Sequence, residues 1–122
     1  MSWEIILHDK EKIIEIIYEG NVNEFQLKEA LEAGKAYILP DQSIKILADC
    51  SGLQSGASIS ELSLFIGELE KLRLPNFREA IILPQLNETK ERVEYYEMAC
   101  LNRGILVKIF KDRENAIRWL KT

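Results

Sequence analysis

The sequence predicts a single α/β domain over residues 1–122, with elements in the order β-β-α-β-α-β-α-β-α. Short apolar runs of strand length alternate with segments whose apolar residues recur at helical spacing. Strands that alternate with helices imply crossover connections, so the sheet is expected to be mixed and mostly parallel, with helices packed against it. The first two apolar runs, residues 3–7 and 12–18, are too close for a crossover and predict an antiparallel hairpin at one edge.

The hairpin is expected to turn at the polar residues 9–11, and Gly20 is expected to end its second strand. That strand is rich in isoleucine without clean alternation, which indicates that both of its faces are covered. Asn23 and Gln26 have the spacing of a capping box, so a helix is expected to begin there. Residues 40–41, Pro-Asp, predict a turn before the next strand.

Residues 43–73 are the centre of the predicted fold: an apolar strand that ends at Asp49, a loop rich in serine and glycine, and an amphipathic helix. Ser58 and Glu61 have capping-box spacing, so Ser58 is expected to begin the helix. The apolar side of this helix is wider than one stripe, and we interpret it as a broad face turned to the core. A surface for a partner or a ligand is the alternative. The residues that widen this face are Ile59 and Leu64.

The second half of the chain continues the alternation. The remaining elements are a strand at 80–83, a helix, a strand at 105–110 and a short final helix. Asn87 or Thr89 is expected to cap the first of these helices, and Gly104 to follow its end. Asp112 is expected to cap the last helix.

Composition excludes several classes of partner. The net charge of −4 and the pI of about 5.1 disfavour a duplex nucleic acid, whose phosphates an acidic surface repels. The first residues do not resemble a signal peptide, and no apolar run is long enough to span a bilayer. Cys50 and Cys100 lie in apolar segments, where reduced and buried thiols are expected. These features fit a protein of the cytoplasm.

Motifs for catalysis or cofactor binding are not found in the sequence. His8 is the only histidine, so neither a metal site nor a cofactor is indicated. The serine-rich loop has neither the nucleophile elbow G-x-S-x-G nor the glycine and lysine patterns of nucleotide-binding loops. We therefore expect no enzymatic activity; if there were any, Asp49, Cys50 or a loop serine would be the candidates.

The residues that could carry a function gather around the end of the central strand. Asp49 is predicted at the carboxyl edge of the sheet, where α/β proteins place their sites, although a bond to the amide of Ser51 or Gly52 is the simpler role. Ser58 caps a helix, and the same position suits a phosphate because amide groups and the helix dipole would stabilise its charge. The candidate interaction loop comprises Asp49, Ser51, Gly52, Ser55, Gly56 and Ser60.

The order of elements and two sequence segments resemble a known family. The segment Ile-Leu-Ala-Asp-Cys-Ser-Gly-Leu at 46–53, followed by a helix, is similar to the STAS fold of sulphate transporters and anti-sigma-factor antagonists. The ending at 110–120, F-x-x-x-x-x-A-x-x-W-L, is similar to that of the SpoIIAA-like family, small stand-alone bacterial proteins also described as STAS/SEC14-like. The resemblance covers nearly the whole chain.

The resemblance implies a role for one serine. Anti-sigma-factor antagonists carry a D-S-S-G segment at the start of the second helix, in which a partner kinase phosphorylates a serine. Ser58 matches that position, but Ala57 stands where the family has the aspartate and no glycine follows. The resemblance therefore implies a serine at the helix start without the full phosphorylation motif.

The leading hypothesis is a non-catalytic regulatory module that binds an unknown protein partner through residues 51–60 and the following helix. The alternative is a carrier of a small, lipid-like apolar ligand, indicated by the extra apolar residues Ile59 and Leu64, by Phe65 and Phe77, and by the SEC14-like description. Surplus apolar surface on a small domain is also compatible with a homo-oligomer.

Overall fold

The computed structural model describes residues 2–38 and 43–122, so the turn expected at residues 40–41 lies outside the described residues. The elements follow the predicted order. They are β1 (Trp3–His8), β2 (Ile13–Asn21), α1 (Glu24–Lys35), β3 (Ile44–Ser55), α2 (Ile59–Lys71), β4 (Phe77–Ile82), α3 (Asn87–Leu101), β5 (Val107–Phe110) and α4 (Arg113–Leu120).

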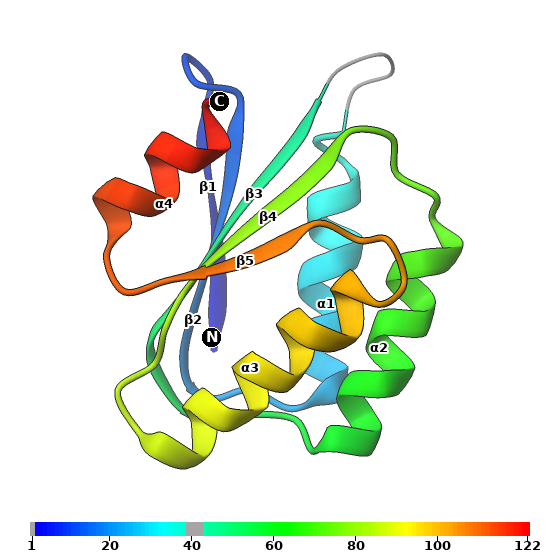
Figure 1. The fold of residues 1–122 in the computed structure, drawn as a ribbon, viewed down its shortest axis with the longest axis vertical. Helices are drawn as coiled ribbons and strands as arrows, with labels where there is room; N and C mark the ends of the chain where they lie inside the picture. The colour runs from blue at the N-terminus through cyan, green and yellow to red at the C-terminus, as the bar shows by residue number, and fades with distance from the viewer. Residues whose placement is uncertain (1, 39–42) are drawn as a thin grey trace.

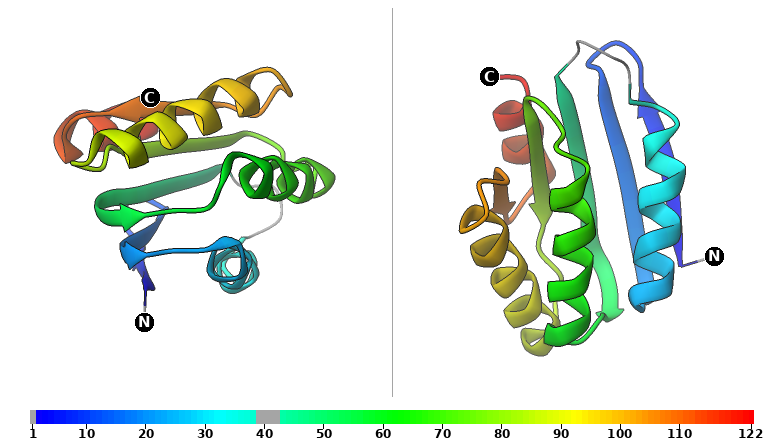
Figure 2. Two further views of the ribbon diagram at one scale, coloured as in Figure 1. Left: turned by 90° about the horizontal axis from the view of Figure 1, so that it is seen from below. Right: turned by 90° about the vertical axis from the view of Figure 1, so that its right-hand side faces the viewer.

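The five strands form one sheet in the order β1-β2-β3-β4-β5. β1 pairs with β2 in antiparallel fashion, and the other three pairs are parallel, so the predicted mixed sheet with a hairpin at its edge is confirmed. Helices α1, α2 and α3 cover one face of this sheet, and, of the part of the chain that the structure describes, α4 is the one helix on the other face (Figures 1 and 2).

Each face of the sheet has its own apolar cluster. On the face covered by three helices the larger cluster includes Ile16, Ile46, Phe65, Ile66, Ile81, Val93 and Tyr96. On the α4 face the smaller cluster consists of Ile13, Leu47, Ala80, Ile82, Ala116 and Leu120, with Trp119 packed against it. This arrangement explains the sequence of β2, because Ile13 faces one cluster while Ile14 and Ile16 face the other.

The strand boundaries around the expected serine-rich loop differ from the prediction. β2 runs through Gly20, which has a φ of 68°, and ends at Asn21. β3 does not end at Asp49 but continues to Ser55, with Gly52 opposite Glu19 and Ser55 opposite Asn21. The expectation of a loop from residue 51 onwards is therefore wrong for most of that segment.

The physical reason is that pairing with β2 outweighs the local preference of serine and glycine for loops. The register shifts twice along this part of the β2–β3 pair, first between Ile17 and Glu19 and again between Gly20 and Asn21. Such bulges let a strand of low β-propensity follow a twisted partner. Ser55 adds a bond of 2.6 Å from its hydroxyl to Oδ1 of Asn21.

Three of the four helix starts were predicted from side-chain caps. Capping boxes form at Asn23 and at Ser58, and the Asp112 carboxylate accepts a bond from the amide of Asn115. The fourth start is a correction, because Leu86 occupies the cap position of α3 and provides no side-chain bond. Thr89 is not at the cap position, because it is already the third residue of α3, and its hydroxyl donates to the carbonyl of Gln54 in β3.

Helix α2 turns a core-facing stripe to the sheet, as predicted, but the stripe is narrower than expected. Its buried residues are Leu62, Phe65, Ile66 and Leu69. Ile59 and Leu64 are 45% and 63% exposed, so the interpretation that they also face the core is wrong.

Candidate functional site

Asp49 lies inside β3 rather than at the sheet edge, on the face that carries α4. Its Oδ1 accepts bonds from the amide of Ser51 at 3.0 Å and from the Ser51 hydroxyl at 2.6 Å. This is the simpler of the two roles considered for Asp49. The carboxylate stabilises the irregular backbone where β3 shifts its register against β2.

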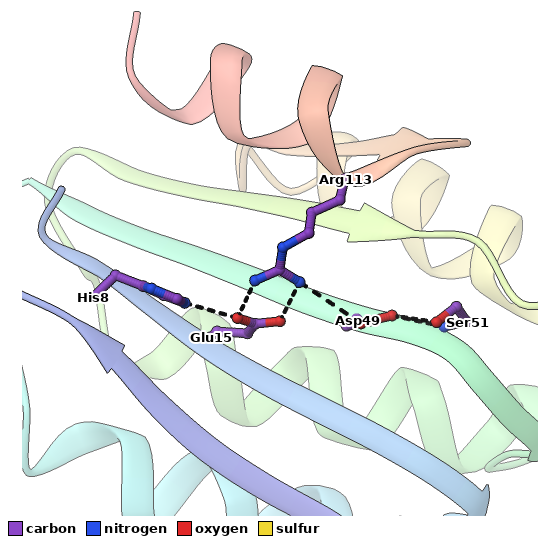
Figure 3. Close-up of polar contacts among 5 residues, drawn as sticks. All are labelled: His8, Glu15, Asp49, Ser51 and Arg113. Carbon is purple, nitrogen blue, oxygen red and sulfur yellow. Dashed lines mark hydrogen bonds and ion pairs between the residues drawn. The ribbon is translucent and has the colours of Figure 1, made fainter.

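A polar cluster on this face joins His8, Glu15, Asp49 and Arg113 (Figure 3). Glu15 of β2 is only 1% exposed, and Arg113 of α4 reaches it with both terminal nitrogens, Nη1 at 2.6 Å from Oε2 and Nη2 in contact with Oε1. His8 Nε2 donates to Oε1 at 2.7 Å, and Arg113 Nη1 lies 3.9 Å from Oδ2 of Asp49.

The charge of Glu15 depends on these partners. Burial by itself would raise the pKa of this carboxyl, but the hydrogen bonds from Arg113 and His8 hold the pKa below its ordinary value. The paired carboxylate links the first residue of α4 to the middle of the sheet. The cluster therefore serves to attach α4, since its hydrogen-bonding groups are directed at one another.

This cluster was not predicted from the sequence, and the His8 side chain in it is half-buried against Glu15. One signal was available: Glu15 is the only charged residue among four isoleucines at positions 13–17, in a strand expected to be covered on both faces. A charge at such a position needs a partner. The partner could not be named, because Arg113 is 98 residues away in sequence.

Ser58 occupies the cap of α2 as predicted. Its hydroxyl accepts a bond from the amide of Glu61 at 3.2 Å, and the Glu61 carboxylate accepts one from the amide of Ser58 at 2.8 Å. The Ser60 hydroxyl lies 3.3 Å from that of Ser58. Within the described residues the candidate loop is thus divided: Asp49, Ser51, Gly52 and Ser55 belong to β3, Gly56 follows the strand, and Ser58 and Ser60 belong to the start of α2.

A cavity of about 120 Å³ lies between the sheet and the three helices that cover it. Its walls are almost entirely apolar and come from β2, β3, β4, α1, α2 and α3; they include Ile16, Ala30, Gly34, Ile46, Leu62 and Phe65. The volume is close to that of an engineered cavity of about 150 Å³ that binds benzene. It can accommodate a compact apolar molecule.

Glu79 of β4 brings a carboxyl group into this apolar wall. The hydroxyl of Tyr96, on α3, donates to its Oε1 at 2.7 Å. Burial raises the pKa of Glu79 to about 7, because the apolar surroundings disfavour the charged form. Glu79 was not among the predicted site residues, although a glutamate directly before the apolar run 80–83 was a visible signal.

The two cysteines are free and buried, as expected. Cys50 lines the cavity, and burial raises the pKa of its thiol far above the ordinary value. Burial also raises the pKa of the Cys100 thiol, to about 12. Since the thiolate is the reactive form, neither residue has the environment of a catalytic nucleophile.

Over residues 2–38 and 43–122 no group of three histidine, cysteine or carboxylate side chains is arranged to hold a metal ion. In the same part of the chain no helix is long and apolar enough to cross a membrane.

The architecture is that of a SpoIIAA-like fold. A crystal structure with that fold, of an uncharacterised protein of the DUF3478 family from Shewanella loihica PV-4, superposes with a TM-score of 0.65. The two sequences are 18% identical, and the match covers 97% of this chain and 91% of that one. No protein-family model and no curated protein matches the sequence. The predicted fold is therefore confirmed, and at this identity the similarity concerns the fold alone.

Proposed function

We propose that the protein is a non-catalytic module that binds a compact apolar molecule between its sheet and helices α1–α3. The cavity of about 120 Å³ is the observation that carries this proposal. Ligand sites are typically concave and apolar, with few polar groups, and the walls around Glu79 have this composition. The size favours a ring or a short branched chain as the small apolar ligand.

The absence of catalysis is part of the proposal. The raised pKa of both thiols argues against a cysteine nucleophile. Asp49 is engaged by Ser51, and Glu15 by Arg113 and His8, so these carboxylates serve structural bonds. These observations support a binding role over an enzymatic one.

Filling the cavity tests the proposal. Gly34 of α1 lines it, and a Cβ atom added there would meet no atom within 4 Å, so the Cβ of Gly34→Leu fits and the rest of the side chain should occupy part of the cavity. Gly67→Leu in α2 is the matched control, because Gly67 is not part of the cavity wall. Toluene is a suitable probe, because dry apolar cavities of this size bind benzene-like molecules.

Toluene should raise the thermal unfolding midpoint of the wild type and of Gly67→Leu, since a ligand that binds only the folded state stabilises it. The midpoint of Gly34→Leu should not respond. If toluene at saturation leaves the wild-type midpoint and its amide NMR spectrum unchanged, the proposal is wrong.

A regulatory interaction module, the leading hypothesis from the sequence, is the second candidate. It is favoured by the exposure of Ile59 and Leu64 beside the Ser58 cap, where a partner could cover them. Intact-mass analysis of the chain isolated from its native cells tests the switch role of Ser58. A phosphate on wild type that is missing from Ser58→Ala supports this role, and a fully unmodified chain under all growth conditions opposes it.

A further inference from the structure

Glu79 is the polar group around which the cavity can select its ligand, provided that the proposed binding function holds. Alternate residues of a strand share a face, so Glu79 lies between Phe77 and Ile81, both of which line the cavity. Its partner across the β3–β4 pair is Ile46, another wall residue. The Glu79 carboxyl group is therefore surrounded by apolar residues of the sheet in this part of the cavity wall.

The groups that face this carboxyl do not neutralise it. In the described part of the chain, the side chains whose titration is affected by the charge of Glu79 include Tyr18 from β2, Cys50 from β3, and Tyr96 and Cys100 from α3, and none of these four is a cation. Among the described residues only the Tyr96 hydroxyl donates to Glu79, and it contacts Oε1. The second oxygen is left for a ligand.

The two cations in the cavity wall are engaged elsewhere. Lys35 Nζ lies 2.9 Å from the Glu32 carboxylate on α1. Arg92 donates to the carbonyl of Gly56 and to the carboxylate of Glu88. An anionic ligand would therefore find Glu79 in the cavity without a free compensating charge.

We propose that the cavity takes a compact apolar molecule bearing a single hydroxyl or amino group, and discriminates against the same skeleton bearing a carboxylate. A hydroxyl or ammonium group donates to the free oxygen of Glu79, and a hydrogen bond to a charged acceptor is stronger than one between neutral groups. A ligand carboxylate would meet a like charge in surroundings of low polarity, where repulsion is weakly screened.

Four probes of one skeleton test this inference: toluene, benzyl alcohol, benzylamine and benzoate, titrated at pH 7.5 with amide NMR shifts as the readout. Benzyl alcohol and benzylamine should bind the wild type at least about tenfold more tightly than benzoate, a difference of about 1.4 kcal/mol. Glu79→Gln should remove most of that difference, because the charge is lost while the shape is kept. Glu4→Gln, at an exposed position on the opposite sheet face, removes the same charge outside the cavity and should leave the difference unchanged.

The outcomes separate this inference from the proposed function. If benzoate binds as tightly as benzyl alcohol, the selectivity is wrong and the binding function stands. If toluene binds and the two donor-bearing probes do not, the selectivity is again wrong. If none of the four probes binds, both proposals are overturned. The wild-type ranking alone decides between these results, so a Glu79→Gln chain that failed to fold would not prevent the test.

Discussion

Glu15 and Glu79 show how the surroundings set the behaviour of two identical side chains. They lie on opposite faces of one sheet, each at an inward-facing position of its strand. Glu15 has Arg113 and His8 as donors and keeps a lowered pKa in spite of its burial. Among the described residues, Glu79 has only the Tyr96 hydroxyl as a donor, and burial raises the pKa of Glu79 to about 7. Glu15 stabilises the attachment of α4 to the sheet, whereas Glu79 places a carboxyl group in the cavity wall.

The raised pKa of Glu79 predicts a specific pH dependence of stability. Between about pH 4.5, the ordinary pKa, and about pH 7, the folded state binds more protons at Glu79 than the unfolded state does, so stability falls as the pH rises. The shift corresponds to a loss on the order of 3 kcal/mol. Glu79→Gln should therefore be about as stable as the wild type at pH 5 and more stable at pH 8, as measured by urea unfolding.

Comparing the wild type with Glu79→Gln separates the pH dependence of stability that is due to Glu79 from that of the other titrating groups. The lowered pKa of Glu15 acts in a different range, because its stabilising effect is complete above about pH 4.5 and is lost as the pH falls further. Glu4→Gln should follow the wild-type curve. A Glu79→Gln chain whose stability falls between pH 5 and 8 as steeply as that of the wild type would contradict the prediction.

The candidate site was predicted less well than the fold because its contacts join distant residues. Ser58 could be recognised as a cap, since both partners of the box lie within four residues. Glu79 and Tyr96 are 17 residues apart, and their meeting depends on how α3 packs on β4. At both Glu15 and Glu79 the sequence has a carboxylate in or beside an apolar segment. Tertiary packing then decides whether a cation lies next to that carboxylate.

The boundaries of helices and strands were predicted correctly where the residues that set them lie within or directly beside the element itself. The caps of α1, α2 and α4 depend on side chains a few residues apart, and all three were predicted. The end of β3 depends on a second strand, so serine and glycine residues that favour a loop are instead held in a strand by β2. The cap of α3 was wrongly predicted because the cap position is Leu86, one residue before Asn87, which has no side chain that can accept a capping bond.

The capping role of Ser58 predicts the effect of substitutions at the start of α2. Ser58→Ala removes the acceptor for the Glu61 amide and should cost about 1 kcal/mol of unfolding free energy. Ser58→Asp should stay within a few tenths of the wild type, since aspartate is an equally good cap. Urea unfolding followed by circular dichroism measures both.

Ser60→Ala is the matched control, because this exposed serine lies within the first turn and does not cap the helix. Its stability should change by less than about 0.5 kcal/mol. Equal stability of Ser58→Ala and the wild type would show that the Ser58 side chain contributes nothing to the start of the helix and would contradict the prediction.

For the whole molecule, the central question is whether the two faces of the sheet fold as one unit. The α4 face is covered by a single helix of eight residues, attached through Leu120, Ala116 and the bond from Arg113 to Glu15. A helix of that length is not stable by itself, so its order depends on the sheet. The sheet in turn needs α4 to keep Leu47 and Ile82 from water.

This mutual dependence predicts that a cavity on the α4 face weakens the entire protein. Leu120 is fully buried, and Leu120→Ala should lower the free energy of unfolding by about 2–5 kcal/mol.

The chain has two tryptophans that report on opposite faces, since Trp3 packs on the larger cluster and Trp119 on the smaller one. Trp119→Phe leaves Trp3 as the reporter, and Trp3→Phe leaves Trp119. In both backgrounds, fluorescence should show that Leu120→Ala lowers the free energy of unfolding by the same amount, because small domains unfold cooperatively. Leu64→Ala, at a mostly exposed position, should cost less than about 0.5 kcal/mol in both. A transition that moves at Trp119 while Trp3 stays unchanged would mean that α4 detaches independently and that the two faces are separate folding units.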